Sequence, residues 1–386
     1  MKVLHVAASL DPEYGGPVEV VMGLTRALAK QGVEVSVFAP SKDVESIFTN
    51  NLKGVTVKLF PRGPFSKFWP AHSSSLAEVL MKEVSGFHLI HIHEIWHHPN
   101  YSAYKAAKFA GKPFIVTIHG QLEPWCLNHK PFKKRIYSAL IQRRILRKAS
   151  VLHAVTKAEV NNISNFVDNQ NICFVPNGLN PEEYEQLTDR KDISNLYSRR
   201  RDKKVILFLG RIHPIKGLDI LARSFAEIAR QRDDVRLLIA GPDDSKYQNK
   251  IDKIIEAEGV SDNVIFTGML TGHEKIAALR GADVFVLPSY SEGFSMAVLE
   301  AMICAVPVIV THQCSFPEVA ESKAGLVIEP NVDQLTDSLT KLLNEPQLCR
   351  EMGARGQRLV MEKFIWDKVA AQMIGLYEDA FKRVNP

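Results

Sequence analysis

The stretch Ser-Glu-Gly-Phe-Ser-Met-Ala-Val-Leu-Glu-Ala-Met-Ile-Cys-Ala-Val-Pro, residues 291–307, decides how the second half of this chain folds. Apolar runs at 283–287 and 306–310 flank it, so the pattern predicts a strand, a loop, a helix and a second strand. Ser295 is a suitable N-cap for the helix, and Pro307 prevents its continuation. The unit is typical of an α/β sheet.

Two acids lie in this stretch, Glu292 on the expected loop and Glu300 within the expected helix. Open α/β sheets bind their ligands in the crevice beyond the carboxyl ends of the strands. We therefore expect both acids at a binding site. The alternative is that each is a structural acid, either favoured by the helix dipole or held in an ion pair.

Outward from this unit, strand-like and helical stretches alternate along most of the chain. The first series predicts strands at 2–10, 34–38, 55–60, 88–93, 113–119, 151–156 and 172–175. The second series predicts strands at 205–209, 235–240, 264–267, 283–287, 306–310 and 326–328. Alternation of this kind predicts parallel, doubly wound sheets, and hence an α/β fold of two Rossmann-like domains.

The domain boundaries follow from the same pattern. We assign residues 1–180 to the first domain, the polar, charge-rich segment 181–204 to a linker, and residues 205–365 to the second domain. Only helices follow the last strand. Since no strand remains to pair with, we expect the terminal helix at 366–386 to return to the first domain.

Composition excludes several classes of protein. With 386 residues, 46% hydrophobic and 24% charged, the chain matches an ordinary globular protein of two domains. A net charge of +5 does not by itself indicate a nucleic-acid partner, and none is expected. Five scattered cysteines favour reduced thiols and a cytoplasmic protein. No apolar run is long enough to predict a membrane-spanning helix.

Glycines and cations follow the ends of several expected strands. Gly15-Gly16 opens a helix, where backbone N–H groups favour an anion, although a simple tight turn has the same sequence. Arg211 and Lys216 follow the first strand of the second domain, where such cations can neutralise a diphosphate in place of a metal ion. A solvated surface role is the alternative for both.

No metal or other cofactor is expected. Asp243-Asp244 is the nearest approach to a metal-binding acidic pair. His91 and His93 alternate along a strand, which favours packing or a place on the rim of a site over metal binding.

The combination of these motifs resembles the retaining GT-B glycosyltransferases of family 4, of the kind found in exopolysaccharide and O-antigen biosynthesis. The resemblance covers nearly the whole chain, and the Glu-Gly-Phe to Glu-Ala-Met stretch is its most characteristic part. It is carried by Gly15-Gly16, His119-Gly120, Asn177-Gly178, Gly210-Arg211, Lys216-Gly217, Glu292-Gly293-Phe294 and Glu300.

This resemblance implies two domains facing a deep cleft and a metal-independent hexosyltransferase. The donor would be a UDP- or GDP-sugar, and the acceptor a hydroxyl of a saccharide or polyprenyl-linked saccharide. By the resemblance, Glu292 contacts sugar hydroxyls, Glu300 contacts the ribose, and Arg211 and Lys216 hold the diphosphate.

The remaining donor contacts are also implied by the resemblance. The donor loop comprises Gly293, Phe294 and Ser295, and Ser295 stands where many relatives carry glycine. From the other domain, Gly15, Gly16 and His119 face the donor, and Gly268 and Met269 border the nucleobase. A buried, structurally satisfied histidine is the alternative for His119.

The acceptor is expected on the first domain, where Trp96 and Trp125 are candidates to stack on sugar rings; Trp125 could equally cover the core. Residues 130–148 carry eight basic and no acidic residues. We expect the apolar side of this helix, including Ile136 and Leu140, to dock on the sheet, and its bases to be attracted to an anionic membrane surface. The protein would then be cytoplasmic, peripheral at the inner face of the plasma membrane.

Two other functions stay open at this point. A nucleotide-sugar epimerase of GT-B architecture would need further acid/base carboxylates in the first domain, for which Glu94 and Glu123 are available. A non-catalytic nucleotide-sugar sensor would not need both the cation pair and the acid pair.

Overall fold

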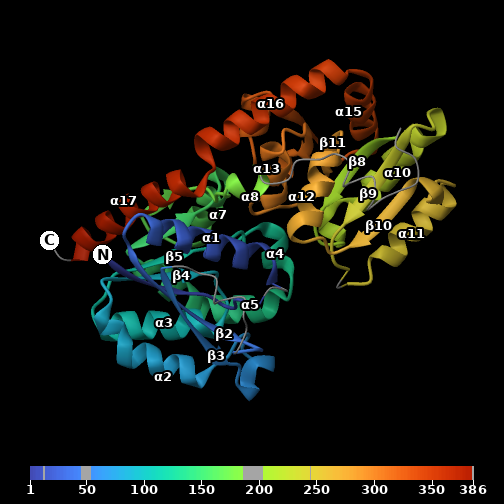
Figure 1. The fold of residues 1–386 in the computed structure, drawn as a ribbon. Helices are drawn as coiled ribbons and strands as arrows, with labels where there is room; N and C mark the ends of the chain where they lie inside the picture. The colour runs from blue at the N-terminus through green and yellow to red at the C-terminus, as the bar shows by residue number, and fades with distance from the viewer. Residues whose placement is uncertain (12–13, 45–53, 186–202, 244, 385–386) are drawn as a thin grey trace. The chain divides into compact units, whose positions relative to one another are not determined.

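The computed structural model describes residues 1–11, 14–44, 54–185, 203–243 and 245–384, and it has an α/β fold (Figure 1). The chain divides into two compact units, Met1–Gly178 with Trp366–Pro386, and Leu179–Ile365. Most of the expected linker, residues 186–202, lies outside the described residues, as does Asp244.

The first unit contains a seven-stranded parallel sheet in the order β3-β2-β1-β4-β5-β6-β7. The order reverses between β1 and β4, which pair with each other through Val3 and Leu89. This reversal is the switch point of a doubly wound sheet. The strands are β1 (Lys2–Val6), β2 (Glu34–Ser41), β3 (Val55–Pro61), β4 (Leu89–His93), β5 (Phe114–Thr117), β6 (Val151–Ala154) and β7 (Ile172–Phe174).

Helices cover both faces of this sheet. Figure 1 shows α2 and α3 beside each other on one face and α1 with α17 on the other. Because both faces are covered, the residues of the central strands are buried almost throughout instead of alternating between buried and exposed. The helices are α1 (Gly16–Lys30), α2 (Ser74–Glu83), α3 (His98–Phe109), α4 (Pro124–Asn128), α5 (Pro131–Tyr137), the π-helical turn η5 (Ser138–Gln142), α6 (Arg143–Lys148), α7 (Lys157–Phe166) and α17 (Trp366–Val384), with 3₁₀ turns η3 (Pro64–Lys67) and η4 (Val84–Gly86).

The terminal helix α17 belongs to the first unit because its first residue is anchored there. Trp366 is 4% exposed, and its indole lies against Gly23 of α1 and against Gly178. A side chain at Gly23 would overlap the indole. The expected return of the C-terminal helix to the first domain is confirmed.

The second unit contains a six-stranded parallel sheet in the order β10-β9-β8-β11-β12-β13, and the order reverses between β8 and β11. The strands are β8 (Lys204–Leu209), β9 (Val235–Ala240), β10 (Val264–Gly268), β11 (Val284–Leu287), β12 (Val308–Thr311) and β13 (Gly325–Ile328). The helices are α8 (Glu182–Glu185), α10 (Leu218–Gln231), α11 (Gln248–Ala257), α12 (Gly272–Gly281), α13 (Met296–Ile303), α14 (Glu318–Glu321), α15 (Val332–Asn344) and α16 (Pro346–Lys363), with 3₁₀ turns η6 (Pro214–Lys216), η7 (Ser261–Asn263) and η8 (His312–Cys314).

The interior of the second unit is apolar. Phe208 and Phe285 on adjacent strands and Phe225 on α10 are fully buried. Burial of a phenylalanine side chain contributes roughly 1.5–3 kcal/mol. The Rossmann-like α/β fold expected from the sequence is therefore confirmed for both units.

Among the described residues, no helix combines the length and apolar character needed to cross a membrane.

Candidate functional site

Glu292, the first acid of residues 291–307, is held by a lysine from another loop. Lys216 Nζ lies 2.5 Å from Glu292 Oε1, and Ser289 Oγ donates to the same oxygen at 2.7 Å. Glu292 is 8% exposed, and the Lys216 side chain is 17% exposed. Two residues that the sequence assigned to one ligand are therefore in direct contact.

The switch point of the second sheet brings these residues together. Lys216 follows β8 and Glu292 follows β11, the two strands between which the order reverses. Gly217 has φ 68°, and a side chain there would overlap the carbonyl of Pro288, so only glycine permits this approach. Tyr290 N also donates to Ile215 O at 2.7 Å, which pins the two loops to each other.

The second acid, Glu300, lies inside α13 and is 4% exposed. Its Oε1 lies 2.7 Å from Lys275 Nζ and accepts a hydrogen bond from Tyr184 Oη at 2.9 Å. Ser295 Oγ caps α13 by accepting from Val298 N, so Glu300 has no part in capping the helix. Each buried acid thus has its own lysine, as a buried carboxylate requires.

Sequence reasoning missed three of these partners, Lys275, Tyr184 and Ser289. They are single residues on α12, on α8 and in the loop after β11, without a motif around them. Only the folded sheet brings them to the two acids, and no local pattern could have indicated them.

Arg211 is exposed immediately after β8 and makes no hydrogen bond or ion pair to any residue the structure describes. Gly268 ends β10 with φ 71°, and Met269 beyond it is 54% exposed. The ring of Phe294 packs against Phe316 and Phe364, so this side chain belongs to the edge of the core. Gly293, beside it, can offer a ligand only its backbone.

In the first unit, the glycine pair starts α1 after the switch-point strand β1. Gly15 has φ 65°, a conformation that favours glycine. A Cβ atom added at Gly15 or Gly16 would meet no atom within 4 Å. The start of α1 therefore borders open space, as an anion site at a helix N-terminus requires.

His119 lies just beyond β5 in a strained turn with φ 54°. The buried carboxylate of Glu159 holds this turn by accepting from Gly120 N at 2.5 Å and from Val155 N at 2.7 Å. Burial raises the pKa of Glu159 to about 7. Burial, and to a smaller extent His153, lowers the pKa of His119 to about 3, so its imidazole is neutral at pH 7.

Three histidines lie close enough together to suggest a metal site: His5, His91 and His93. The His91 and His93 rings are stacked 4.2 Å apart, and His5 Nδ1 lies 2.9 Å from His93 Nε2. Stacked rings that share hydrogen bonds do not direct three lone pairs at one point, as zinc would require. His91 and His93 are fully buried, as the packing interpretation expects.

The aromatic candidates differ in exposure. Trp96 has φ 73°, is half-buried and packs against Tyr137 and Phe166. Trp125 on α4 is 42% exposed and stacks on His129. Next to Trp96, burial raises the pKa of Glu94 to about 7, and Gln121 Nε2 donates to its carboxylate at 3.0 Å.

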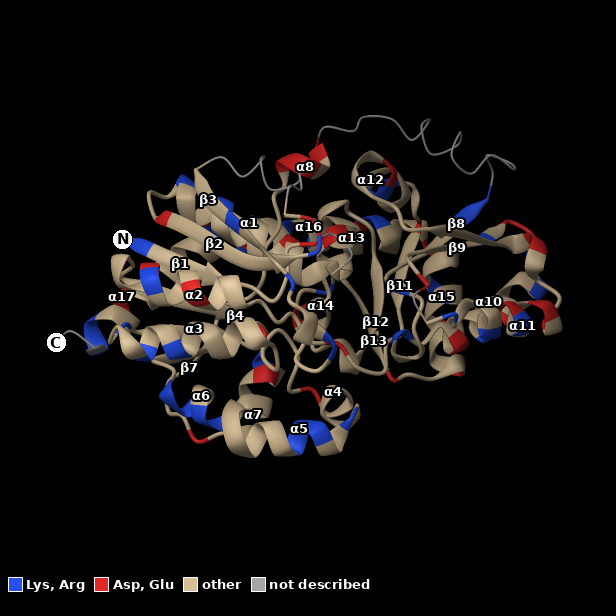
Figure 2. Ribbon diagram, turned by 90° about the horizontal axis from the view of Figure 1, so that it is seen from below, with Lys and Arg blue, Asp and Glu red and all other residues tan. Residues whose placement is uncertain are grey.

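The expected docking of Ile136 and Leu140 on the sheet was wrong. Phe132, Ile136 and Leu140 are 76%, 47% and 71% exposed, whereas Ile141 packs against the core. The buried side of this helical segment runs through Ser138 and Gln142 of η5, so Ile136 and Leu140 face outward. Figure 2 shows Lys and Arg along α5 and α6.

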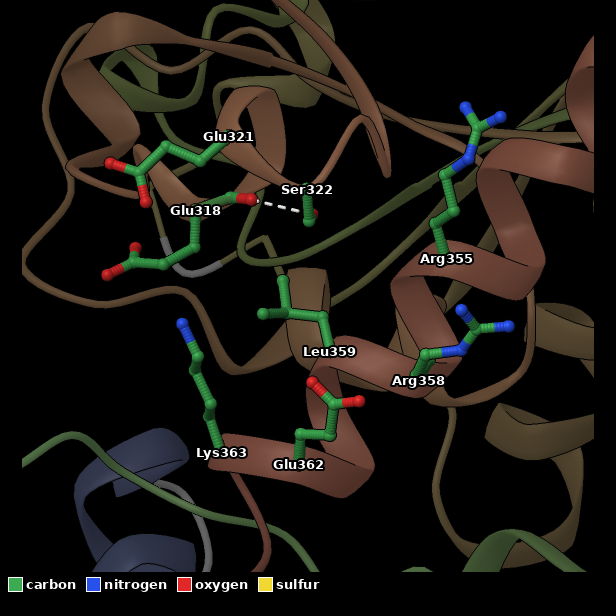
Figure 3. Close-up of a pocket in the computed structure, with 8 residues that line it drawn as sticks. All are labelled: Glu318, Glu321, Ser322, Arg355, Arg358, Leu359, Glu362 and Lys363. Carbon is green, nitrogen blue, oxygen red and sulfur yellow. Dashed lines mark hydrogen bonds between the residues drawn. The ribbon is translucent and has the colours of Figure 1, made fainter.

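A separate hollow in the second unit lies between α14 and α16 and contains none of the expected site residues (Figure 3). Its side chains carry both charges, and Ser322 Oγ donates to the Glu318 carbonyl at 2.7 Å. Arg355 and Arg358 point away from Glu318 and Glu321 in this view. The mixed charges do not converge on one point.

Comparisons with known proteins agree with this geometry. The family described as "Glycosyl transferases group 1" matches residues 189–359, and "Glycosyl transferase 4-like domain" matches residues 15–178. MMP alpha-(1->4)-mannosyltransferase of Mycolicibacterium hassiacum is 30% identical over 290 residues, which cover 71% of this chain and 67% of that protein. D-inositol 3-phosphate glycosyltransferase of Paenarthrobacter aurescens is 27% identical over 398 residues, covering 98% and 97% of the two chains.

A solved structure extends the likeness to the whole fold. Sucrose-phosphate synthase from Thermosynechococcus elongatus superposes with a TM-score of 0.82 at 20% identity, covering 99% of this chain and 100% of that one. With the two family matches and the mannosyltransferase relative, this fold identifies the chain as a member of family 4 of the glycosyltransferases, which have the GT-B fold.

Proposed function

We propose that the protein is a retaining, metal-independent hexosyltransferase that moves a sugar from a UDP- or GDP-sugar to a hydroxyl of a saccharide or lipid-linked saccharide. The observation that carries the proposal is the pair of buried acid–lysine contacts, Glu292 with Lys216 and Glu300 with Lys275. The first of these spans the switch point of the second sheet, the place where doubly wound sheets bind ligands.

The acids receive the hydroxyl groups of the donor in this proposal. A carboxylate only accepts hydrogen bonds, so Glu292 suits sugar hydroxyls and Glu300 suits the ribose. The hydrogen bonds and ion contacts described above fall on Oε1 of each acid, so Oε2 can accept hydrogen bonds from a ligand.

The cations receive the diphosphate. Arg211 is exposed and, within the described parts of the chain, has no competing carboxylate, so its planar guanidinium is available to phosphate oxygens. Lys216 has three donors on a flexible chain and is able to contact Glu292 and a phosphate at once. On this proposal the two cations take the place of a metal ion.

The chemistry proposed for this site is mainly electrostatic. As the bond between the sugar anomeric carbon and the diphosphate oxygen breaks, negative charge grows on the leaving group, and Arg211 and Lys216 stabilise it. The acceptor oxygen bonds to the same face of the carbon, and its proton passes to the departing diphosphate. The alpha linkage in the name of the mannosyltransferase relative supports retention if its donor is alpha-linked.

The acceptor side involves a membrane surface in this proposal. The exposed Phe132, Ile136 and Leu140 lie among the basic residues of α5 and α6, a combination suited to an anionic lipid surface. An acceptor carried on a polyprenyl lipid at the cytoplasmic face would be reached from there. Trp96 and Trp125 are the proposed sugar-stacking residues.

Liposome flotation tests the membrane contact. The unmodified protein should float with vesicles containing anionic lipid at low salt, and the Phe132→Ser/Leu140→Ser variant should float much less. Phe109 on α3 is also 76% exposed and provides the matched control, since Phe109→Ser should leave flotation unchanged. Equal flotation of all three proteins would remove this part of the proposal.

A donor panel tests the reaction itself. The protein is incubated with labelled UDP-, GDP- and ADP-sugars, and products are separated into transferred, hydrolysed and epimerised sugar. Glu292→Gln and Glu300→Gln should each lose at least tenfold in turnover. Glu321→Gln changes an exposed acid on α14 and should not. An epimerised product would indicate the epimerase, and tight binding without turnover would indicate the sensor.

A further inference from the structure

A continuous line of polar side chains runs through the core of the first unit and ends at His119. It crosses strands β6, β5, β4 and β1 and takes one residue from α17. The contacts, in order, are Val175 O to His153 Nε2 at 2.8 Å, His153 Nδ1 to Thr117 Oγ1 at 2.7 Å, Thr117 Oγ1 to His91 Nε2 at 2.6 Å, His91 Nδ1 to Tyr377 Oη at 2.7 Å, Tyr377 Oη to His5 Nε2 at 3.5 Å, His5 Nδ1 to His93 Nε2 at 2.9 Å, and His93 Nδ1 to His119 Nε2 at 3.1 Å.

All five imidazoles in this line are neutral at pH 7. Burial lowers the pKa of His5 to about 3 and that of His153 to about 4, and it holds the pKa of His91 and His93 well below the usual value. A neutral imidazole carries one proton, so one nitrogen donates and the other accepts.

The backbone carbonyl of Val175, at one end of the line, sets the direction in which the hydrogen bonds are donated. The carbonyl oxygen of Val175 can only accept, so His153 carries its proton on Nε2 and its Nδ1 accepts. Thr117 must then donate its hydroxyl proton to His153 Nδ1. Its oxygen is left to accept from His91 Nε2.

The same direction of hydrogen-bond donation continues through Tyr377 of α17. His91 carries its proton on Nε2, so its Nδ1 accepts from the hydroxyl of Tyr377. The Tyr377 oxygen is then an acceptor for His5 Nε2, in the longest contact of the line. The opposite arrangement would leave two lone pairs facing each other in a site that buries both residues completely.

The last two links reach His119. With its proton on Nε2, His5 accepts at Nδ1 from His93 Nε2, and His93 accepts at Nδ1 from His119 Nε2. His119 therefore donates inward from Nε2. Its Nδ1 keeps a lone pair, and no other described residue hydrogen-bonds to it.

We propose that this line fixes the tautomer of His119, so that Nδ1 is a hydrogen-bond acceptor for a sugar hydroxyl, with Thr117 and Tyr377 as positioning residues. The role for the sugar rests on the proposed function; the tautomer does not. An acceptor nitrogen selects a donor sugar with a free hydroxyl at the facing carbon. A carboxylate there, as in a uronic acid, presents only lone pairs and is disfavoured.

The tautomer is measured directly, without substrate. Two-bond ¹H–¹⁵N correlation spectra of the ¹⁵N-histidine-labelled full chain at pH 7.5 distinguish protonated from unprotonated ring nitrogens. His119, assigned through His119→Gln, should carry its proton on Nε2 and none on Nδ1. A proton on Nδ1, or an imidazolium, would overturn the inference.

Tyr377→Phe tests the role of α17. Loss of the hydroxyl removes the link that sets the direction beyond His91, so the His5, His93 and His119 signals should become mixed between tautomers while His153 keeps its proton on Nε2. The matched control is Tyr104→Phe, which changes another buried tyrosine of the first unit that lies outside the line. A single, unchanged His119 tautomer in Tyr377→Phe would contradict the positioning role.

Activity gives a separate readout once a donor is known. Tyr377→Phe should lower kcat/KM for that donor by about three- to tenfold, the loss expected for one neutral hydrogen bond. It should narrow the preference for a hydroxylated donor over the corresponding uronate, and Tyr104→Phe should do neither. An unchanged preference would contradict the acceptor role of Nδ1. Absence of transfer with every donor, despite the expected tautomer, would refute only the proposed function.

Discussion

The two sheets share a doubly wound parallel topology but differ in the polar groups that their strands bury. The first sheet buries neutral histidines inside its strands, such as His91 and His93, and hydrogen bonds to Thr117, Tyr377 and other histidines satisfy them. The strands of the second sheet contain no histidine, and its candidate site holds charge as ion pairs beyond the strand ends, as in Lys216 with Glu292.

This difference follows from the cost of burying each form. A neutral imidazole needs only hydrogen-bond partners, which neighbouring strands can supply. A buried carboxylate or ammonium needs an opposite charge, and an arriving ligand can take over part of that role. We infer that the hydrogen bonds of the first sheet orient His119. The ion pairs beyond the strand ends of the second sheet hold charged side chains that can contact a bound donor.

Acidification should give the largest difference between the two units, because it should lower the stability of the first unit more than that of the second. Seven histidines of the first unit have their pKa lowered, chiefly by burial: His5, His91, His93, His97, His98, His119 and His153. Each binds fewer protons when folded, so its stability contribution is intact above the unfolded pKa of about 6.5 and is lost by about 1.4 kcal/mol per pH unit below it. Glu94 and Glu159, whose folded pKa is raised to about 7, oppose this in the same window because they favour folding as the pH falls.

The net expectation is a loss of several kcal/mol from the first unit between pH 7.5 and 5.5. All four tryptophans, Trp69, Trp96, Trp125 and Trp366, belong to this unit, so urea unfolding followed by tryptophan fluorescence reports it alone. Hydrogen exchange of peptides from the second sheet provides the internal control and should change less. Earlier loss of protection in the second sheet would contradict the prediction.

Arg211→Ala should give the next largest effect. Removal of one preorganised charge at a developing anion lowers kcat by about 10²–10³-fold. Donor affinity should fall far less, and stability should not change, because Arg211 is exposed. Steady-state kinetics and calorimetric donor binding measure the two separately, with Arg358→Ala, which changes an exposed arginine on α16, as control. A normal kcat would refute the role of Arg211.

Lys216→Met should destabilise the second unit by up to about 3 kcal/mol, because it leaves Glu292 buried without its cation. The double variant Lys216→Met/Glu292→Gln removes both charges and should recover most of that stability without recovering turnover. Urea unfolding and kinetics of both variants test this, with Lys341→Met on α15 as the exposed control. If the double variant is no more stable than the single one, Lys216 does not stabilise the fold by compensating the buried charge of Glu292.

Tyr184→Phe should have the smallest effect. It removes one hydrogen bond to Glu300 but leaves Lys275 in place, which should cost about 1 kcal/mol of second-unit stability. Tyr290→Phe, which removes a more exposed bond to Asp219, should cost less. Equal losses in the two variants would mean that Glu300 does not depend on Tyr184.

The fold was largely predictable because its signals are local. Apolar runs separated by amphipathic helices fix strand number and order of occurrence, and Ser295 before an apolar stretch predicts the start of α13. Expected strand ends were too long in places, since residues 7–10 are buried but lie beyond β1. Burial extends the apolar run past the last ladder hydrogen bond, so the pattern could not give the boundary.

The candidate site was predictable only in part. Glu292 and Glu300 lie eight positions apart in one motif, but their partners come from other parts of the chain. Ile136 and Leu140 face outward because the buried side of their helical segment carries two polar residues, Ser138 and Gln142. Hydrophobic periodicity assigns apolar residues to the buried side, so it placed Ile136 and Leu140 wrongly.

By itself, the sequence determined two Rossmann-like domains, a returning helix and a pair of acids at a strand end, because periodicity, capping and motif spacing are properties of neighbouring residues. Only the tertiary structure decided that Lys216 and Lys275 neutralise those acids and that Tyr377 continues a hydrogen-bonded line to His119. These contacts join residues 25 to 372 positions apart, and pairing over such distances depends on sheet order and helix return.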